Sequence, residues 1–186
     1  MMRGLVLAGG QSRRFGSDKA LAIYKGESFL QRSVRILERM KLDPWVVGRP
    51  DVSYFFPSNR ILYDQLKGKG PLAGIHAAMN KFPGDDWLVL TCDMPFLNEK
   101  ALEDLVFGYK DDPVLTLYRS PEGRIEPFPG IYPYLLFAKI YKNLLTEKLA
   151  MHELIELDFK KNILPFNDDK KILENVNHPF CLESLN

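Results

Sequence analysis

A segment near the amino terminus, rich in glycine and cationic residues, has the residue types that bind polyphosphates. It runs from Leu7 to Lys19 and reads LAGGQSRRFGSDK. Paired glycines let backbone N–H groups approach an anion without interference from a Cβ atom. The residues that follow add further donors and positive charge, namely Ser12, Arg13, Arg14 and Lys19. The segment therefore predicts a binding loop for a nucleoside triphosphate.

This segment differs from two familiar phosphate-binding loops. A P-loop requires four residues between its glycines and then Lys-Ser or Lys-Thr, whereas Gly10 and Gly16 are separated by five and Ser17 follows. The dinucleotide pattern G-x-G-x-x-G is also absent. A glycine turn beside a solvated basic patch is the simpler alternative. Whether the segment binds a triphosphate or is only such a turn depends on which other polar residues accompany it.

Two aspartates follow short apolar runs elsewhere in the chain. Asp64 follows residues 60–63, and six residues later comes the string G-P-L-A-G at 70–74. Asp93 follows residues 87–90 and precedes Met-Pro-Phe. Magnesium usually takes only one or two protein carboxylates when a substrate phosphate supplies other ligands, so one aspartate can suffice. The alternatives are a tight turn that opens a helix at 70–74 and a helix-capping role for Asp93.

The elements that must position these residues alternate through about residue 118. Apolar runs predict strands and amphipathic stretches predict helices. The strands are expected at 4–8, 45–47, 60–63, 87–90 and 114–118, and the helices at 27–40, 72–81 and 99–107. This alternation is typical of a right-handed, parallel α/β sheet. Such sheets bind ligands beyond the carboxyl ends of their strands, where the glycine segment and both aspartates are expected.

The later part of the chain is less regular. Residues 123–132 indicate an edge strand interrupted by Pro127 and Pro129. Helices are expected at 133–149, at 151–157 and, as a short element, after Pro179. We predict a single domain over residues 1–186, with a nucleotide-binding part at about 1–118 and an acceptor-binding part at about 119–186.

Composition excludes several classes of protein. The net charge of the 186 residues is +1, which gives no general attraction to nucleic acid or to an anionic membrane. No run approaches the roughly 20 apolar residues that span a bilayer. Cys92 and Cys181 match no metal-binding spacing and are expected to be reduced thiols, with Cys92 packed inward. We therefore expect a cytoplasmic protein.

Three of these strings together resemble the signatures of the molybdenum cofactor guanylyltransferases, the MobA-like nucleotidyltransferases. The first signature is L-A-G-G-x-S-x-R-M-G-x-D-K, from which this chain departs only by Phe15 in place of methionine. The strings Asp64…GPLAG and CDMPF resemble the second and third. The resemblance implies a three-layer, Rossmann-like nucleotidyltransferase fold with a mostly parallel central sheet. It also implies Mg²⁺-dependent transfer of GMP from GTP to the terminal phosphate of molybdopterin, the molybdenum cofactor.

The same resemblance assigns roles to individual residues. Lys19 would grip the phosphates, Arg14 fills the arginine position of the signature, and Asp93 would hold the magnesium ion, so these are the expected catalytic residues. The expected nucleotide-binding residues are Leu7, Ala8, Gly9, Gly10, Lys19, Asp64 and Asp93.

Weaker matches lie in the later half. Glu126 lies in an E-P element that resembles the start of the family's acceptor-facing strand, and Asn175 and Asn177 lie in a string that resembles its N-x-N-T-P element, with His178 in place of threonine. These three residues are the expected acceptor-binding residues. An exposed edge-strand glutamate and a helix cap at Asn177 are the alternatives.

One departure from the family leaves the base open. Members often carry an asparagine after the second strand that helps to hold guanine, but here residues 46–49 read Val-Val-Gly-Arg. Cytidylyl transfer to a molybdopterin, or activation of a sugar phosphate, is the nearest alternative. A non-catalytic nucleotide-binding adaptor in cofactor insertion is another, although Lys19 and Asp93 together favour an enzyme. Other proteins of cofactor synthesis or molybdoenzyme maturation are possible partners.

Overall fold

A mostly parallel sheet forms the centre of the computed structural model, which describes residues 1–9, 19–48, 56–63, 68–110 and 114–176. Within these ranges the sheet has seven strands in the order β5-β4-β1-β6-β8-β7-β9. Only β8 runs antiparallel to its neighbours. The strands are β1 (Met2–Leu7), β4 (Pro44–Val47), β5 (Ile61–Leu62), β6 (Asp86–Thr91), β7 (Leu115–Arg119), β8 (Ile125–Tyr132) and β9 (Lys161–Pro165).

Five α-helices connect these strands in the described part of the chain: α1 (Phe29–Arg39), α2 (Gly70–Lys81), α3 (Glu99–Lys110), α4 (Phe137–Leu145) and α5 (Met151–Ile155). Short 3-10 turns are η1 (Lys19–Leu21), η3 (Ser58–Arg60), η4 (Tyr134–Leu136) and η5 (Lys170–Leu173), and a small hairpin pairs β2 (Ile23–Tyr24) with β3 (Glu27–Ser28). The hydroxyl of Ser28 accepts the N–H of Gln31, and the Gln31 amide oxygen accepts the N–H of Ser28. This capping box starts α1 at Phe29 rather than at Glu27.

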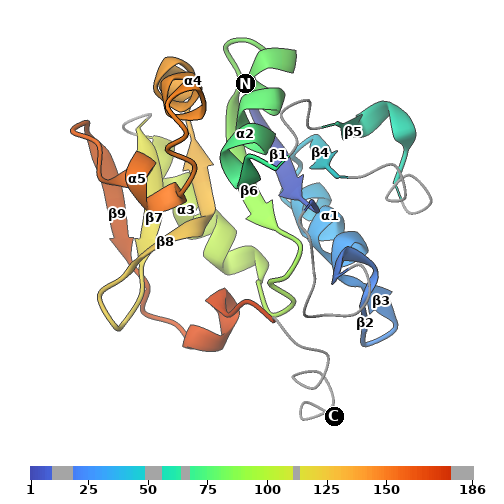
Figure 1. Ribbon diagram of the computed structural model, residues 1–186. Coiled ribbons are helices and arrows are strands. Elements are labelled where there is room, and N and C mark those ends of the chain that lie inside the picture. Colours follow the sequence, from blue (N-terminus) through green and yellow to red (C-terminus); the bar gives the residue numbers. More distant parts are fainter. Residues whose placement is uncertain (10–18, 49–55, 64–67, 111–113, 177–186) are drawn as a thin grey trace.

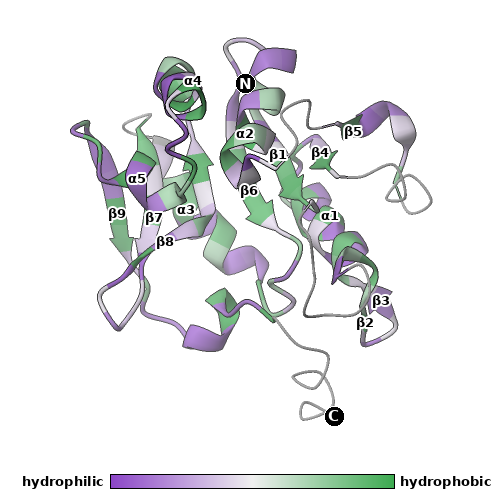
Figure 2. Ribbon diagram, in the orientation of Figure 1, coloured by the Kyte–Doolittle hydropathy of each residue, from purple (hydrophilic) through white to green (hydrophobic). Residues whose placement is uncertain are grey.

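The helices cover both faces of the sheet (Figure 1). Successive strand residues point to opposite faces, so Leu88 and Leu90 of β6 share one core with α1 and α3. Trp87 and Val89 share the other core with α2 and α4. In Figure 2 the central strands β1 and β6 are largely green, in keeping with burial on both faces. The predicted three-layer α/β architecture is confirmed.

The prediction of an edge strand at 123–132 was wrong, because β8 lies between β6 and β7. The prolines are tolerated because they fall in an irregularity of the ladder. On the β7 side, Leu117 pairs with Gly130 and the next residue, Tyr118, pairs with Glu126, so residues 127–129 are passed over. No N–H from Pro127 or Pro129 is required there.

The actual edge on that side is β9, which the sequence pattern did not reveal. Its sequence, KNILP, has no long apolar run, and all five residues are partly or fully exposed. The helix expected at 133–149 is divided into η4 and α4, and α5 ends at Ile155 rather than at 157. The short helix predicted after Pro179 lies outside the described residues. No helix among the described residues is long and apolar enough to cross a membrane.

Candidate active site

The site forms where the strand order reverses direction. From β1 the chain moves outward to β4 and β5, and then α2 carries it back to β6 on the other side of β1. Ligands of open α/β sheets bind beyond the carboxyl ends of the strands at such a switch point. Here those ends are Leu7 of β1 and Thr91 of β6, which are paired in register.

The predicted nucleotide segment continues directly from β1. The N–H of Ala8 donates to the carbonyl of Val47 at 2.8 Å, and the N–H of Cys92 donates to the carbonyl of Leu7 at 3.2 Å. Neighbouring strands therefore hold residues 7 and 8 from both sides. A Cβ atom at Gly9 would have only the Val47 carbonyl within 4 Å, at 3.9 Å, among the described residues. Packing against the described residues does not require glycine there, and these residues leave the backbone at Gly9 accessible.

Lys19 and Asp93 meet at this end of the sheet although they are 74 residues apart in the chain. The Lys19 Nζ donates to the Asp93 Oδ2 at 2.8 Å. The side chains are 13% and 21% exposed, so the ion pair is largely shielded from water. Lys19 opens η1, whose next residue, Ala20, is buried in the core beside α1. Burial of η1 therefore fixes the backbone from which the ammonium reaches Asp93.

Asp93 is held by its backbone, while one of its two carboxylate oxygens has no hydrogen-bond partner among the described residues. The N–H of Val176 donates to the Asp93 carbonyl at 2.9 Å. The Asp93 Oδ1 is buried and accepts no hydrogen bond from the described residues. The Asn98 side chain caps α3 by accepting the N–H of Ala101 at 2.9 Å. A helix-capping role for Asp93, the alternative considered above, is therefore wrong.

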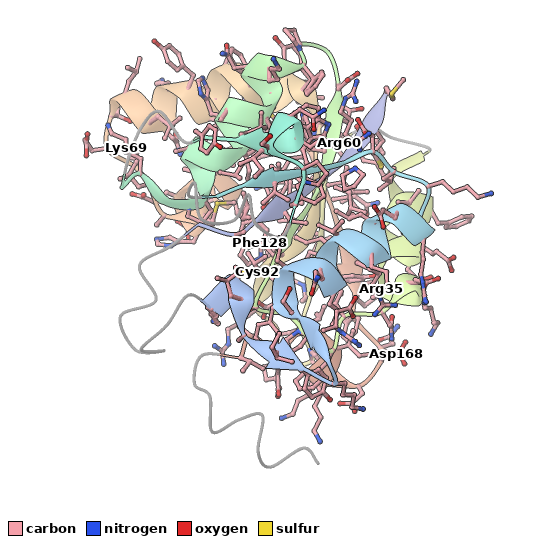
Figure 3. The ribbon with its side chains drawn as sticks, turned by 90° about the vertical axis from the view of Figure 1, so that its right-hand side faces the viewer. Arg35, Arg60, Lys69, Cys92, Phe128 and Asp168 are labelled. Carbon is pink, nitrogen blue, oxygen red and sulfur yellow. The ribbon has the colours of Figure 1, made fainter. Side chains whose placement is uncertain are left out.

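Side-chain packing is defined for Cys92, the residue before Asp93, and for His76 of α2. Cys92 is buried in the core that includes α1 and α3, which confirms its predicted inward packing. Phe128 of β8 packs against the same core, and both residues are labelled in Figure 3. His76 of α2 stacks against Phe137 and Tyr141 of α4, with ring centroids at 5.0 and 5.4 Å. Burial lowers the pKa of His76.

Two of the three acceptor-binding candidates, Glu126 and Asn175, are described, and both belong to the later half of the chain. Because β8 is antiparallel and pairs Gly130 with Val89, the residues before Gly130 lie toward the carboxyl end of β6. Glu126 lies in this stretch, is the second residue of β8 and is partly buried. Asn175 is exposed and directly precedes Val176, the residue tied to Asp93. Their contact with an acceptor stays a prediction.

Four predicted residues lie outside the described part of the chain: Gly10, Arg14, Asp64 and Asn177. Among the residues that are described, the site unites Leu7, Ala8, Gly9, Lys19 and Asp93. Their binding and catalytic roles stay predictions.

Sequence reasoning missed two features of the site. The hydroxyl of Thr91 is buried and has no hydrogen-bond partner among the described residues. A polar residue at the end of an apolar strand was the available signal for it. The backbone contact of Val176 with Asp93 left no signal, because a main-chain donor is independent of residue type.

The comparisons with known proteins agree with this geometry. The family model described as "MobA-like NTP transferase domain" matches residues 4–160. A protein of Geobacillus sp. (strain WCH70) named "Probable molybdenum cofactor guanylyltransferase" is 34% identical over 96% of this chain and 94% of its own length. A protein of the same name from Bacillus cytotoxicus is 31% identical over 94% of this chain and 90% of its own.

A solved structure supports the fold. The crystal structure of molybdopterin-guanine dinucleotide biosynthesis protein A from Archaeoglobus fulgidus has a TM-score of 0.79 to this chain at 24% identity. The match covers 99% of this chain and 96% of the other. The family resemblance predicted from the three signature strings is confirmed, and the chain belongs to the family of MobA-like NTP transferase domains.

Proposed function

We propose that this protein transfers GMP from GTP to the terminal phosphate of molybdopterin and releases pyrophosphate. The observation that carries the proposal is the meeting of residues 7–9, Lys19 and Asp93 at the switch point of the sheet. The 34% identical relative named as a molybdenum cofactor guanylyltransferase supports the choice of substrates. We expect the reaction to take place in the cytoplasm.

The reaction is an in-line displacement at the α-phosphorus of GTP. An oxygen of the acceptor phosphate forms the new P–O bond, and the bond between the α-phosphorus and the β-bridging oxygen breaks, so that pyrophosphate leaves with the electron pair. The acceptor phosphate is already anionic near neutral pH, so no general base is required. The main obstacle is the repulsion between two anions.

The described residues meet that obstacle with positive charge and an open backbone. Lys19 places an ammonium group at the site, and Gly9 leaves room for phosphate oxygens to approach the main chain. Preorganised donors of this kind stabilise the charge that develops on the attacked and leaving phosphates. Arg14 and Gly10 would add to this set. Glu126, Asn175 and Asn177 would contact the pterin acceptor.

The chemistry of the site also fits a magnesium ion. Among the described residues no three His, Cys, Asp or Glu side chains gather into a ready-made metal site. Magnesium does not need one when substrate phosphates supply most of its ligands. Asp93 would hold it, because its Oδ1 is buried and has no partner among the described residues. When bound, the ion would neutralise charge on the reacting phosphates.

Comparing the binding of different nucleoside triphosphates tests the base selectivity and the triphosphate binding of the site together. A ligand at 100 times its dissociation constant stabilises a protein by about 2.7 kcal/mol. For a domain of this size the melting temperature then rises by roughly 5–10 °C. We expect this rise with GTP and Mg²⁺, and a much smaller one with ATP, CTP or UTP. A rise confined to CTP would replace guanylyl transfer by cytidylyl transfer.

Pyrophosphate release in the presence of a molybdopterin source tests the catalytic assignment. We expect Asp93→Asn to slow turnover about a hundredfold, the effect of losing one preorganised charged contact. The matched control is Asp168→Asn, because Asp168 also forms an ion pair, with Lys100 at 2.7 Å, on the surface. Equal turnover in the two variants would remove Asp93 from the mechanism.

A further inference from the structure

The contact between Lys19 and Asp93 joins two groups that the proposed function assigns to different partners. Lys19 is expected to bind phosphate, and Asp93 is expected to bind a divalent cation. In the structure each is instead neutralised by the other, at 2.8 Å between Nζ and Oδ2. Loading the site with metal and nucleotide therefore requires this ion pair to open or to be shared.

An ammonium in this position opposes the binding of a second cation. Coulomb repulsion between cations a few ångströms apart is weak in bulk water but several times stronger in a shielded site. This pair is shielded, with side chains that are 13% and 21% exposed. By comparison, the surface pair of Lys100 and Asp168 is 66% and 42% exposed at 2.7 Å. The inhibitory effect of the lysine on cation binding should therefore be marked at Asp93.

The backbones on both sides of the pair are anchored, so we expect the exchange to proceed by a side-chain movement. Ala20 is buried next to Lys19, and the N–H of Ala22 donates to the Lys19 carbonyl at 3.2 Å. The Asp93 carbonyl is held by Val176. A lysine side chain has several rotatable bonds and can redirect its ammonium while its backbone stays in place.

We infer that Lys19 is the resident counter-cation of Asp93 and couples metal binding to nucleotide binding. This inference rests on the proposed function. In the empty site the ammonium neutralises the carboxylate and weakens its affinity for a divalent cation. When a triphosphate enters, its oxygens accept the Lys19 ammonium and the carboxylate becomes available. One internal ion pair is exchanged for two pairs with ligands, so metal and nucleotide bind together rather than separately.

Binding of Mn²⁺ alone, followed by calorimetry and by the spin-resonance signal of the free ion, tests this inference. The Lys19→Met variant should bind Mn²⁺ at least about fivefold more tightly than the unaltered protein, the lower end of typical coupling between two ligands. The same variant should bind GTP more weakly in EDTA. A lysine with a merely structural role would not move the two affinities in opposite directions.

Matched variants isolate the local effect. Lys100→Met removes one ammonium and one ion pair elsewhere, and should leave the Mn²⁺ affinity unchanged. Lys19→Met combined with Asp93→Asn should lose the gain, because the gain requires the carboxylate. Circular dichroism checks folding, and Lys19→Gln replaces Lys19→Met if the methionine variant does not fold.

The outcomes separate the inference from the function on which it rests. If Lys19→Met binds Mn²⁺ no more tightly than the unaltered protein, or if Lys100→Met gains as much, the inference is overturned. If the unaltered protein neither binds GTP nor releases pyrophosphate, the proposed function fails, whatever the Mn²⁺ affinities are. A guanylyl transfer that persists while Mn²⁺ affinity is insensitive to Lys19 rejects the inference alone.

Discussion

The last glycine of the G-P-L-A-G string, Gly74 in α2, offers a quantitative test of how the helix supports the site. A Cβ atom at this position would lie 2.8 Å from the Leu7 Cδ2 and 3.3 Å from the Val47 Cγ1. Both residues end strands that lead into the site. The perturbation is Gly74→Ala, which adds one methyl group at this contact.

Two effects of opposite sign compete in this variant. Alanine in place of glycine in a helix interior gains about 1 kcal/mol in intrinsic propensity. Against this, an added methyl in a tightly packed core typically costs about 1–3 kcal/mol. Leu7 is only 7% exposed, so its side chain cannot swing into solvent to relieve the contact. We expect packing to win, with a net loss of roughly 1 kcal/mol in the free energy of unfolding.

Urea denaturation and thermal melting measure this loss. For a domain of this size 1 kcal/mol corresponds to about 2–4 °C in melting temperature. A second substitution identifies the clash as the cause, because Leu7→Val removes the δ carbons that the new methyl would meet. Residues in direct contact give non-additive effects, so the double variant should lose less stability than the sum of the two single variants.

The opposite result would refute the reasoning. If Gly74→Ala raises stability by about 1 kcal/mol, helix propensity acts unopposed, and α2 does not press against the end of β1. Strict additivity with Leu7→Val would lead to the same conclusion. The structural role of the G-P-L-A-G string would then be to form a turn, and not to allow close packing of α2 against β1.

Two further predictions concern polar groups that are wholly or partly withdrawn from water. Thr91→Val removes a buried hydroxyl that has no partner among the described residues, so we expect the free energy of unfolding in urea to rise by about 1 kcal/mol; a fall of that size would reveal a hydrogen bond to the hydroxyl. Burial lowers the pKa of His76, so the unfolded chain takes up a proton at a higher pH than the folded protein does. The stability associated with His76 is therefore present above about pH 6.5 and is lost as the pH falls toward the lowered folded-state pKa. The His76→Phe variant keeps a ring against Phe137. Its melting temperature should fall less between pH 7.5 and pH 5.5 than that of the unaltered protein; equal falls would show that other groups cause the pH dependence.

The parallel part of the fold was predictable because its strands are buried on both faces. A strand between two helical layers must be apolar at consecutive positions, not at alternate ones. Residues 87–90 meet this requirement, and they lie in β6 with two of their side chains in each core. The parallel arrangement also predicted that the polar residues after β1 and β6 would meet, because parallel strands end at the same edge of the sheet.

The other half of the sheet could not be predicted in this way. The prolines of β8 indicated an edge, because a proline cannot donate to a ladder. The structure avoids that requirement with the irregularity after Leu117, whose position depends on how β7 and β8 meet in space. The strand β9 forms by pairing with β7 and has no periodic apolar pattern of its own. Both elements depend on partners that the local sequence does not specify.

The candidate site shows the same division at the level of single residues. Residue types predicted that Lys19 and Asp93 would each bind a charged ligand, and that reasoning treats them as independent. The fold places them in contact, and two adjacent opposite charges neutralise each other unless a ligand offers each a better partner. Their contact therefore makes the affinity of each for its ligand depend on the other. That dependence is a property of the pair and cannot be found by assigning residues one at a time.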